Sequence, residues 1–140
     1  MIRPFRKSDL SEIMQIWLSS NIEVHNFVDE SYWKDNFEFV QKRIPQTTVL
    51  VYEKQNSIAG FIGLTNGYIN GLFVKKIFRS KGIGKSLIEY AKLYNKHLTL
   101  DVYALNQSAV NFYKRESFCI TDQHIDKNTK ALEYTMEFHK

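Results

Sequence analysis

Apolar residues near the start of the chain repeat at the spacing of one helix face. They fall at i, i+3, i+4, i+7 and i+8, as Leu10, Ile13, Met14, Trp17 and Leu18. This pattern predicts an amphipathic helix, with Ser8 or Asp9 placed to cap its N-terminus. A polar and aromatic connection, residues 21–30, separates it from a second helical pattern that we expect Pro45 to end.

Branched and apolar residues dominate the next part of the chain, where the helical period is lost. Residues 47–53 and 58–64 predict two strands of a hairpin, because the polar residues 54–57 form a turn signal between them. A third strand, residues 68–74, is expected after the turn signal Asn66-Gly67.

Helical spacing returns after Gly82 and again, for a short helix, after Asn106. Residues 98–103 and 132–138 instead alternate between apolar and polar side chains, as half-buried strands do. Runs of adjacent strands beside helices point to a mixed α/β sheet rather than a strictly alternating, doubly wound one. No linker or repeat divides the chain, so we expect a single domain, residues 1–140.

The composition fits a globular protein that needs neither disulfides nor a structural metal to fold. Of its 140 residues, 44% are hydrophobic and 14% aromatic, enough at this length for an extensive core. The single cysteine, Cys119, cannot form an internal disulfide, and we expect it to be a small core residue. The chain has neither a leader pattern nor an apolar run of membrane-spanning length, which predicts a soluble cytoplasmic protein without a membrane partner.

The positive charge of the chain is concentrated in one segment. Residues 75–85 carry five cationic side chains and no acidic one, although the formal net charge of the whole chain is only +4. Such a local patch suits a compact polyphosphate better than a nucleic acid, which needs a wider cationic footprint. We therefore expect no nucleic-acid partner, and we keep a nucleic-acid-binding module as an alternative.

The same segment passes from a predicted strand through two glycines into a predicted helix. Glycines let a ligand approach the backbone closely, and free amides at a helix N-terminus favour an anion. Gly84-Lys85-Ser86 imitates the end of a P-loop, but Arg79 stands where that motif needs its first glycine. A dinucleotide motif fits poorly as well, because Leu87 replaces its third glycine.

Two ordered motifs carry a resemblance to a known family. Arg79-Ser80-Lys81-Gly82-Ile83-Gly84 follows the pattern R-x-x-G-x-G, and the stretch from Asn106 to Phe118 resembles N-x-x-A-x-x-F-Y-x-x-x-G-F. Both are typical of the GCN5-related N-acetyltransferase (GNAT) family, and the order of elements agrees over essentially the whole chain. The connection His25-Asn26-Phe27 is similar to that of small bacterial YjaB-type members. The resemblance implies a central mixed sheet of six to seven strands with about four helices.

The resemblance also implies a function, N-acetyl transfer from acetyl-CoA to an amine by direct attack, and the residues that hold the cosubstrate. Backbone amides of the glycine loop would cradle the pyrophosphate, with basic neighbours adding attraction. The preceding strand would pair with the pantetheine arm. Asn106 would bond this arm or only cap its helix. The implied cosubstrate-binding residues are Leu72, Phe73, Val74, Arg79, Ser80, Lys81, Gly82, Ile83, Gly84, Lys85 and Asn106.

Two residues are candidates for the chemistry. Tyr113 would protonate the departing CoA thiolate, although helical spacing alone would make it a core tyrosine. His25 is chemically suited to deprotonate the attacking amine, and its alternative is a polar surface residue. Phe27, Tyr32 and Trp33 are expected either to line the acceptor pocket or to pack between helices.

Further expectations concern partners and departures from the family pattern. The acceptor is a small-molecule or peptide amine, the protein is a monomer or homodimer, and a CoA-binding sensor or inactive relative remains an alternative. The histidines show no metal-ligand spacing, so we expect no metal. Lys76 replaces a common proline, and Ser117 replaces a glycine that would adopt a left-handed cap.

Overall fold

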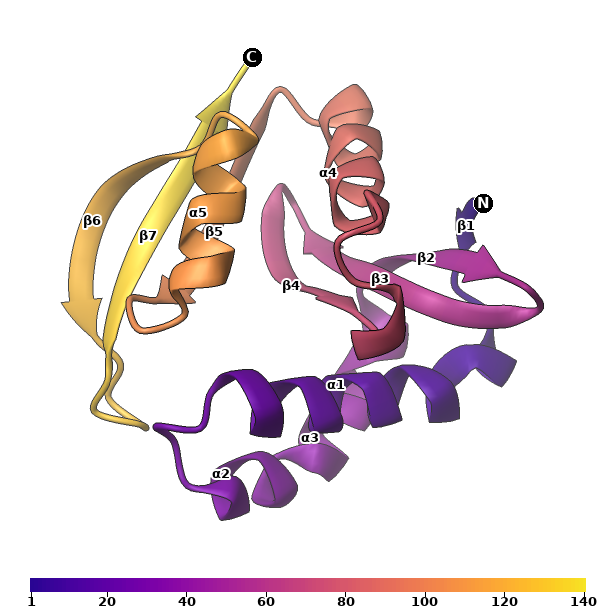
Figure 1. Ribbon diagram of the computed structural model, residues 1–140, viewed down its shortest axis with the longest axis horizontal. Helices are drawn as coiled ribbons and strands as arrows, with labels where there is room; N and C mark the ends of the chain where they lie inside the picture. Colours follow the sequence, from indigo (N-terminus) through magenta and orange to yellow (C-terminus); the bar gives the residue numbers. More distant parts are fainter.

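The computed structural model describes residues 1–140, which form a seven-stranded sheet in the order β1-β2-β3-β4-β5-β7-β6 (Figure 1). Neighbouring strands are antiparallel except β4 and β5, which are parallel. The mixed α/β sheet predicted from the sequence is thereby confirmed. The strands are β1 (Ile2–Pro4), β2 (Thr48–Lys54), β3 (Ser57–Thr65), β4 (Tyr68–Val74), β5 (His97–Tyr103), β6 (Cys119–Ile125) and β7 (Leu132–His139).

Five α-helices accompany the sheet, one more than expected. They are α1 (Leu10–Val24), α2 (Glu30–Asp35), α3 (Phe37–Arg43), α4 (Ile83–Tyr94) and α5 (Gln107–Arg115). The extra helix arises because the second helical pattern divides at Asn36, which ends α2 and precedes α3. The first helix extends beyond the predicted boundary to Val24, and Asn21 lies within it, donating its amide to the Trp17 carbonyl at a distance of 2.9 Å.

Alternating side chains along the strands build two cores on opposite faces of the sheet. Helices α4 and α5 cover one face, where Leu98, Leu100 and Val102 of β5 are buried. Helices α1 to α3 cover the other face, where Val49 and Val51 of β2 are buried. None of the helices is long and apolar enough to span a membrane.

The sheet opens between β4 and β5. Only one pair of residues, Tyr68 and Thr99, is in register between these two strands. Figure 1 shows the strands diverging beyond this point, with α5 beside β5 and the loop that leads into α4 beside the end of β4. The carboxyl half of β4 thus lies at an inner edge of the sheet, and an extended ligand arm has room to enter beside it.

Two local features differ from the sequence-based expectations. Cys119 was expected in the core but is exposed, because it begins β6, the strand at the edge of the sheet. The Asp9 side chain caps no helix amide of α1. Its carboxylate instead accepts two hydrogen bonds of 2.9 Å from the buried guanidinium of Arg3, and a third from the backbone N–H of Arg6.

Candidate active site

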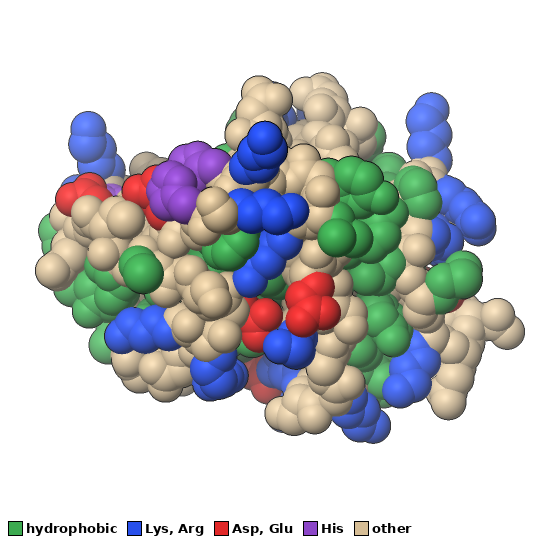
Figure 2. Space-filling view, turned by 90° about the horizontal axis from the view of Figure 1, so that it is seen from above, with side chains coloured by type: hydrophobic (Ala, Val, Ile, Leu, Met, Phe, Trp, Pro, Cys, Tyr) green, Lys and Arg blue, Asp and Glu red, His purple; other side chains and the backbone are tan.

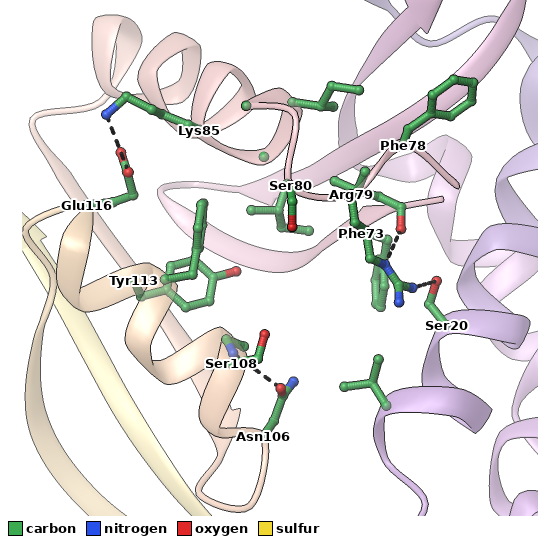
Figure 3. Close-up of a pocket in the computed structure, with 18 of the residues that line it drawn as sticks. Ser20, Phe73, Phe78, Arg79, Ser80, Lys85, Asn106, Ser108, Tyr113 and Glu116 are labelled. Carbon is green, nitrogen blue, oxygen red and sulfur yellow. Dashed lines mark hydrogen bonds and ion pairs between the residues drawn. The ribbon is translucent and has the colours of Figure 1, made fainter. Parts of the chain in front are cut away.

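A cavity of about 480 Å³ occupies the opening of the sheet. It is walled by the end of β4, the loop into α4, the start of α4, helix α5 and the end of α1 (Figure 3). Its volume is in the range usual for small-molecule and cofactor sites. All predicted cosubstrate-binding residues except Lys81 line it, and so do Tyr113 and His25.

The loop before α4 offers backbone groups to an anion. Gly82 precedes the helix with a φ of +83°, a conformation that costs an L side chain about 1–2 kcal/mol. A Cβ built at Gly82 would meet no atom within 4 Å, so this face of the loop is open to a ligand. The first amides of α4 have no partner within the helix and carry its positive dipole end. A phosphate group fits this arrangement without further distortion.

Arg79, the basic residue that begins the R-x-x-G-x-G motif, has its guanidinium engaged by the protein itself. Its Nε donates to the Val74 carbonyl at 2.9 Å, and its Nη1 donates to Glu23 Oε1 at 2.7 Å. A longer contact of 3.4 Å joins Nη2 to the Ser20 hydroxyl, as Figure 3 shows. The guanidinium holds the pKa of Glu23 below its usual range. Arg79 thus fastens the glycine loop to α1 and the end of β4.

The basic segment around this loop is largely neutralised by acidic side chains, most of which lie far away in the sequence. Lys75 pairs with Glu12 at 3.5 Å, Lys76 and Arg79 share Glu23, and Lys85 approaches Glu89 and Glu116 at 3.4 and 3.6 Å. The face drawn in Figure 2 shows basic side chains with acidic ones interspersed among them. This pairing weakens the alternative of nucleic-acid binding, which depends on many available cations.

Tyr113 projects its hydroxyl group from α5 into the cavity (Figure 3). The residue is only 7% exposed, and its ring packs edge-on against Phe112 and Phe118. Burial raises the pKa of the Tyr113 phenol above its usual value, with no contribution from a hydrogen bond. The group is therefore protonated at neutral pH and available as a proton donor.

His25 and Asn106 meet at the other end of the cavity. Asn106 caps α5 by accepting from the Ala109 N–H, and its Nδ2 lies 3.1 Å from His25 Nε2. His25 Nδ1 in turn lies 2.9 Å from Asn21 Oδ1. Burial lowers the pKa of His25 to about 4. Both ring nitrogens are occupied within the protein, which is unfavourable for the general base that the sequence suggested.

The three aromatic residues proposed for the acceptor pocket do not line the cavity. Trp33 is buried in the core and packs edge-on against Trp17, with ring centroids 6.0 Å apart. Trp33 therefore packs between helices in this structure. Phe27 and Tyr32 are partly buried, and Phe27 packs against the Tyr103 ring at 5.3 Å.

Several lining residues were not singled out from the sequence. Ser20 and Val24 come from the end of α1, and Val24 falls within the connection predicted for residues 21–30. Glu116 is the least expected, because its buried carboxylate faces the cavity and is balanced by Lys85. Ala109 and Phe112 belong to the second motif, so that motif carried the signal for them.

The structure also gathers three potential metal ligands that are separated in sequence. His97 on β5 stacks on His139 of β7 with ring centroids 4.3 Å apart, and Glu137 lies beside both. His97 Nε2 bonds Glu137 Oε1 at 2.8 Å. Sequence spacing could not reveal this cluster, because it depends on strand pairing. None of its members lines the cavity.

Comparisons with known proteins agree with this geometry. The family model described as an acetyltransferase (GNAT) domain matches residues 20–138. The peptidyl-lysine N-acetyltransferase YiaC of Escherichia coli is 34% identical over 124 residues, covering 87% of this chain and 85% of that protein. The solution structure of apo-form YjaB from Escherichia coli has a TM-score of 0.87 at 26% identity, covering 99% of this chain and 96% of that one. An aminoglycoside 6'-N-acetyltransferase complexed with coenzyme A shares the fold, with a TM-score of 0.76 at 14% identity, covering 99% and 96% of the two chains.

Proposed function

Because this chain belongs to the GNAT acetyltransferase family, we propose that it transfers the acetyl group of acetyl-CoA to the side-chain amine of a lysine in a peptide. The chain is an N-acetyltransferase, and the lysine acceptor is supported by the relatives named peptidyl-lysine N-acetyltransferases. One observation carries the mechanism. The Tyr113 hydroxyl group faces a cavity that lies between an open strand edge and a helix N-terminus.

The residues of the cavity fit coenzyme A. The free amides at the start of α4 suit the pyrophosphate, and the open space at Gly82 allows it to approach the backbone. The end of β4 pairs with β3 on one side but has no residue in register with β5 on the other, so the backbone groups that face the cavity are available to the amides of the pantetheine arm. Lys81 is an exposed cation of the loop itself and adds positive charge near the phosphate site.

The reaction requires one proton donor. The acceptor nitrogen forms a bond to the acetyl carbonyl carbon, the carbon–sulfur bond breaks, and Tyr113 gives its proton to the departing sulfur. The proton lost by the amine passes to water. The Tyr113 phenolate then takes a proton from water and returns to its acid form. We propose water for this step, since the lone pair of His25 Nε2 is engaged with Asn106. A base role for His25 stays a prediction with less support.

The proposal is tested by offering acetyl-CoA with three acceptors: a peptide with one lysine and a blocked N-terminus, a lysine-free peptide with a free N-terminus, and an aminoglycoside. Thiol release measures turnover, and mass spectrometry locates the acetyl group. We expect transfer to the lysine peptide alone. Transfer only to the free N-terminus or the aminoglycoside would refute the lysine acceptor. Cosubstrate binding without transfer to any amine would favour the CoA-binding sensor.

A further inference from the structure

A continuous hydrogen-bonded relay joins α1 to the N-terminus of α5. Asn21 Nδ2 donates to the Trp17 carbonyl at 2.9 Å, and Asn21 Oδ1 lies 2.9 Å from His25 Nδ1. His25 Nε2 lies 3.1 Å from Asn106 Nδ2, and Asn106 Oδ1 accepts from the Ala109 N–H at 3.3 Å. The relay thus connects residues that are 81 positions apart in the sequence.

The two backbone groups at the ends of the relay fix every proton within it. A carbonyl can only accept, so Asn21 must turn its amide nitrogen to Trp17 and its oxygen to His25. An N–H can only donate, so Asn106 must turn its oxygen to Ala109 and its nitrogen to His25. His25 therefore donates from Nδ1 and accepts at Nε2, which is the neutral ring with the proton on Nδ1. Figure 3 shows the Asn106 oxygen bonded toward the start of α5.

The surroundings of His25 hold the ring in place. Its centroid lies 5.0 Å from that of Tyr103, 5.5 Å from that of Trp33 and 5.7 Å from that of Phe27. A ring packed among three aromatic groups has little freedom to rotate. Protonation of Nε2 would also place two donors face to face, and Asn106 could relieve this only by turning its amide and losing the Ala109 bond.

We propose that His25 is a positioning residue that locks the Asn106 side-chain amide, leaving its second N–H available at the cavity wall to an amide carbonyl of the pantetheine arm. This proposal rests on the proposed function, because it takes the cavity as the coenzyme A site. His25 then contributes to cosubstrate binding through Asn106, without taking a proton from the acceptor amine.

The protonation pattern is tested on the unmodified protein without any ligand. Two-dimensional ¹H–¹⁵N spectra of the imidazole ring distinguish the two neutral tautomers and the charged form. At neutral pH, His25 should have a protonated Nδ1 and an unprotonated Nε2. A proton on Nε2 would overturn the relay, whatever the protein does with acetyl-CoA.

The consequence for binding is tested with three variants and calorimetric titration of coenzyme A. His25→Phe keeps an aromatic ring and removes both nitrogens, so the Kd should rise about three- to tenfold, the value of one hydrogen bond. In His25→Gln, the Nε2 and Oε1 atoms replace the donor and the acceptor of the ring. Its Kd should stay within about twofold of the parent. Asn106→Ala should weaken binding, and adding His25→Phe to it should cause little further loss.

The competing interpretations give different results. A general base would lose at least about a hundredfold in kcat in both the Phe and Gln variants while the Kd stayed constant. If the His25 ring served packing alone, His25→Phe would keep the Kd of the parent and His25→Gln would raise it. Either result, or additive losses of affinity in the double variant, would overturn the positioning role. Failure of the parent protein to bind coenzyme A would instead contradict the proposed function, and the tautomer measurement would still judge the relay.

Discussion

Replacing Tyr113 by Phe removes one oxygen atom from the cavity and leaves the ring in place. The ring packs against Phe112 and Phe118, and those contacts do not involve the hydroxyl group. No hydrogen bond contributes to the raised pKa of the phenol, so the folded protein loses no internal partner. The free energy of unfolding should therefore change by less than about 0.5 kcal/mol, and the affinity for acetyl-CoA should change little.

Turnover should respond much more strongly than stability. Proton donation by a positioned acid is worth about 10² to 10⁴ in rate, or about 3 to 5 kcal/mol of the barrier. Because burial raises the phenol pKa, the acid form persists throughout an assay from about pH 6 to 9, and the loss should be similar over that range. Single-turnover acetyl transfer measures the step directly. Tyr94→Phe, an exposed tyrosine outside the cavity, is the matched control. Equal rates for the Tyr113 variant and the parent would refute the assigned chemistry.

Three further predictions concern the glycine loop, the α5 cap and the buried ion pair. Acetyl-CoA should raise the melting temperature of the parent protein, and Gly82→Val should remove that shift because its side chain fills the open face of the loop. The control Gly63→Ala, outside the cavity, should keep the shift. A normal shift in Gly82→Val would show that the pyrophosphate binds elsewhere. Ser117 has a φ of +74°, so Ser117→Gly should stabilise the fold by about 0.5–1 kcal/mol, which raises the melting temperature by roughly 2–5 °C. The control Ser11→Gly, within a helix, should lower the melting temperature. A lower melting temperature in both variants would contradict the strain argument. Asp9→Asn removes one carboxylate from the buried Arg3 guanidinium, which keeps a contact of 3.2 Å to Glu53, and should cost about 1.5–3 kcal/mol at pH 7 in urea unfolding. Since Arg3 lowers the pKa of Asp9, the stability that the Asp9 carboxylate contributes is present above about pH 4 and is lost as the pH falls through the lower pKa of the folded state. Asp9→Asn should therefore lose less stability than the parent on acidification. An equal loss in both proteins would exclude this ion pair as a cause of acid destabilisation.

The sequence predicted the fold well wherever local signals were strong. The hairpin of β2 and β3, the strand β4 and the helix after Gly82 lie where the hydrophobic periods placed them. The break at Asn36 was missed, because the apolar spacing of Trp33, Phe37 and Val40 continues across it. The end of α1 was missed for a related reason, since Asn21 is polar yet bonded within the helix.

The candidate site was predictable where residues act through the backbone, and less so where their partners are remote. The glycine loop follows from local sequence, but the use of the Arg79 guanidinium depends on Glu23, a residue 56 positions away. The sequence predicted His25 as a candidate residue because it is titratable and lies in a connection between elements. One partner, Asn21, lies four positions away on the same helix. The other, Asn106, becomes a partner only when the end of α1 meets the start of α5. Long-range polar pairing leaves no periodic trace in a sequence.

Because β4 and β5 share only one pair of residues in register, the hydrogen bonding of the sheet is nearly interrupted between them. Strands β1 to β4 form one antiparallel ladder, and β5, β7 and β6 form another. Such ladders are natural units of local opening, so amide hydrogen exchange should follow two distinct protection levels. A molecule that enters the gap touches both ladders at once. Coenzyme A should therefore slow amide exchange in both ladders, because a molecule bound in the gap holds together two units that otherwise open independently.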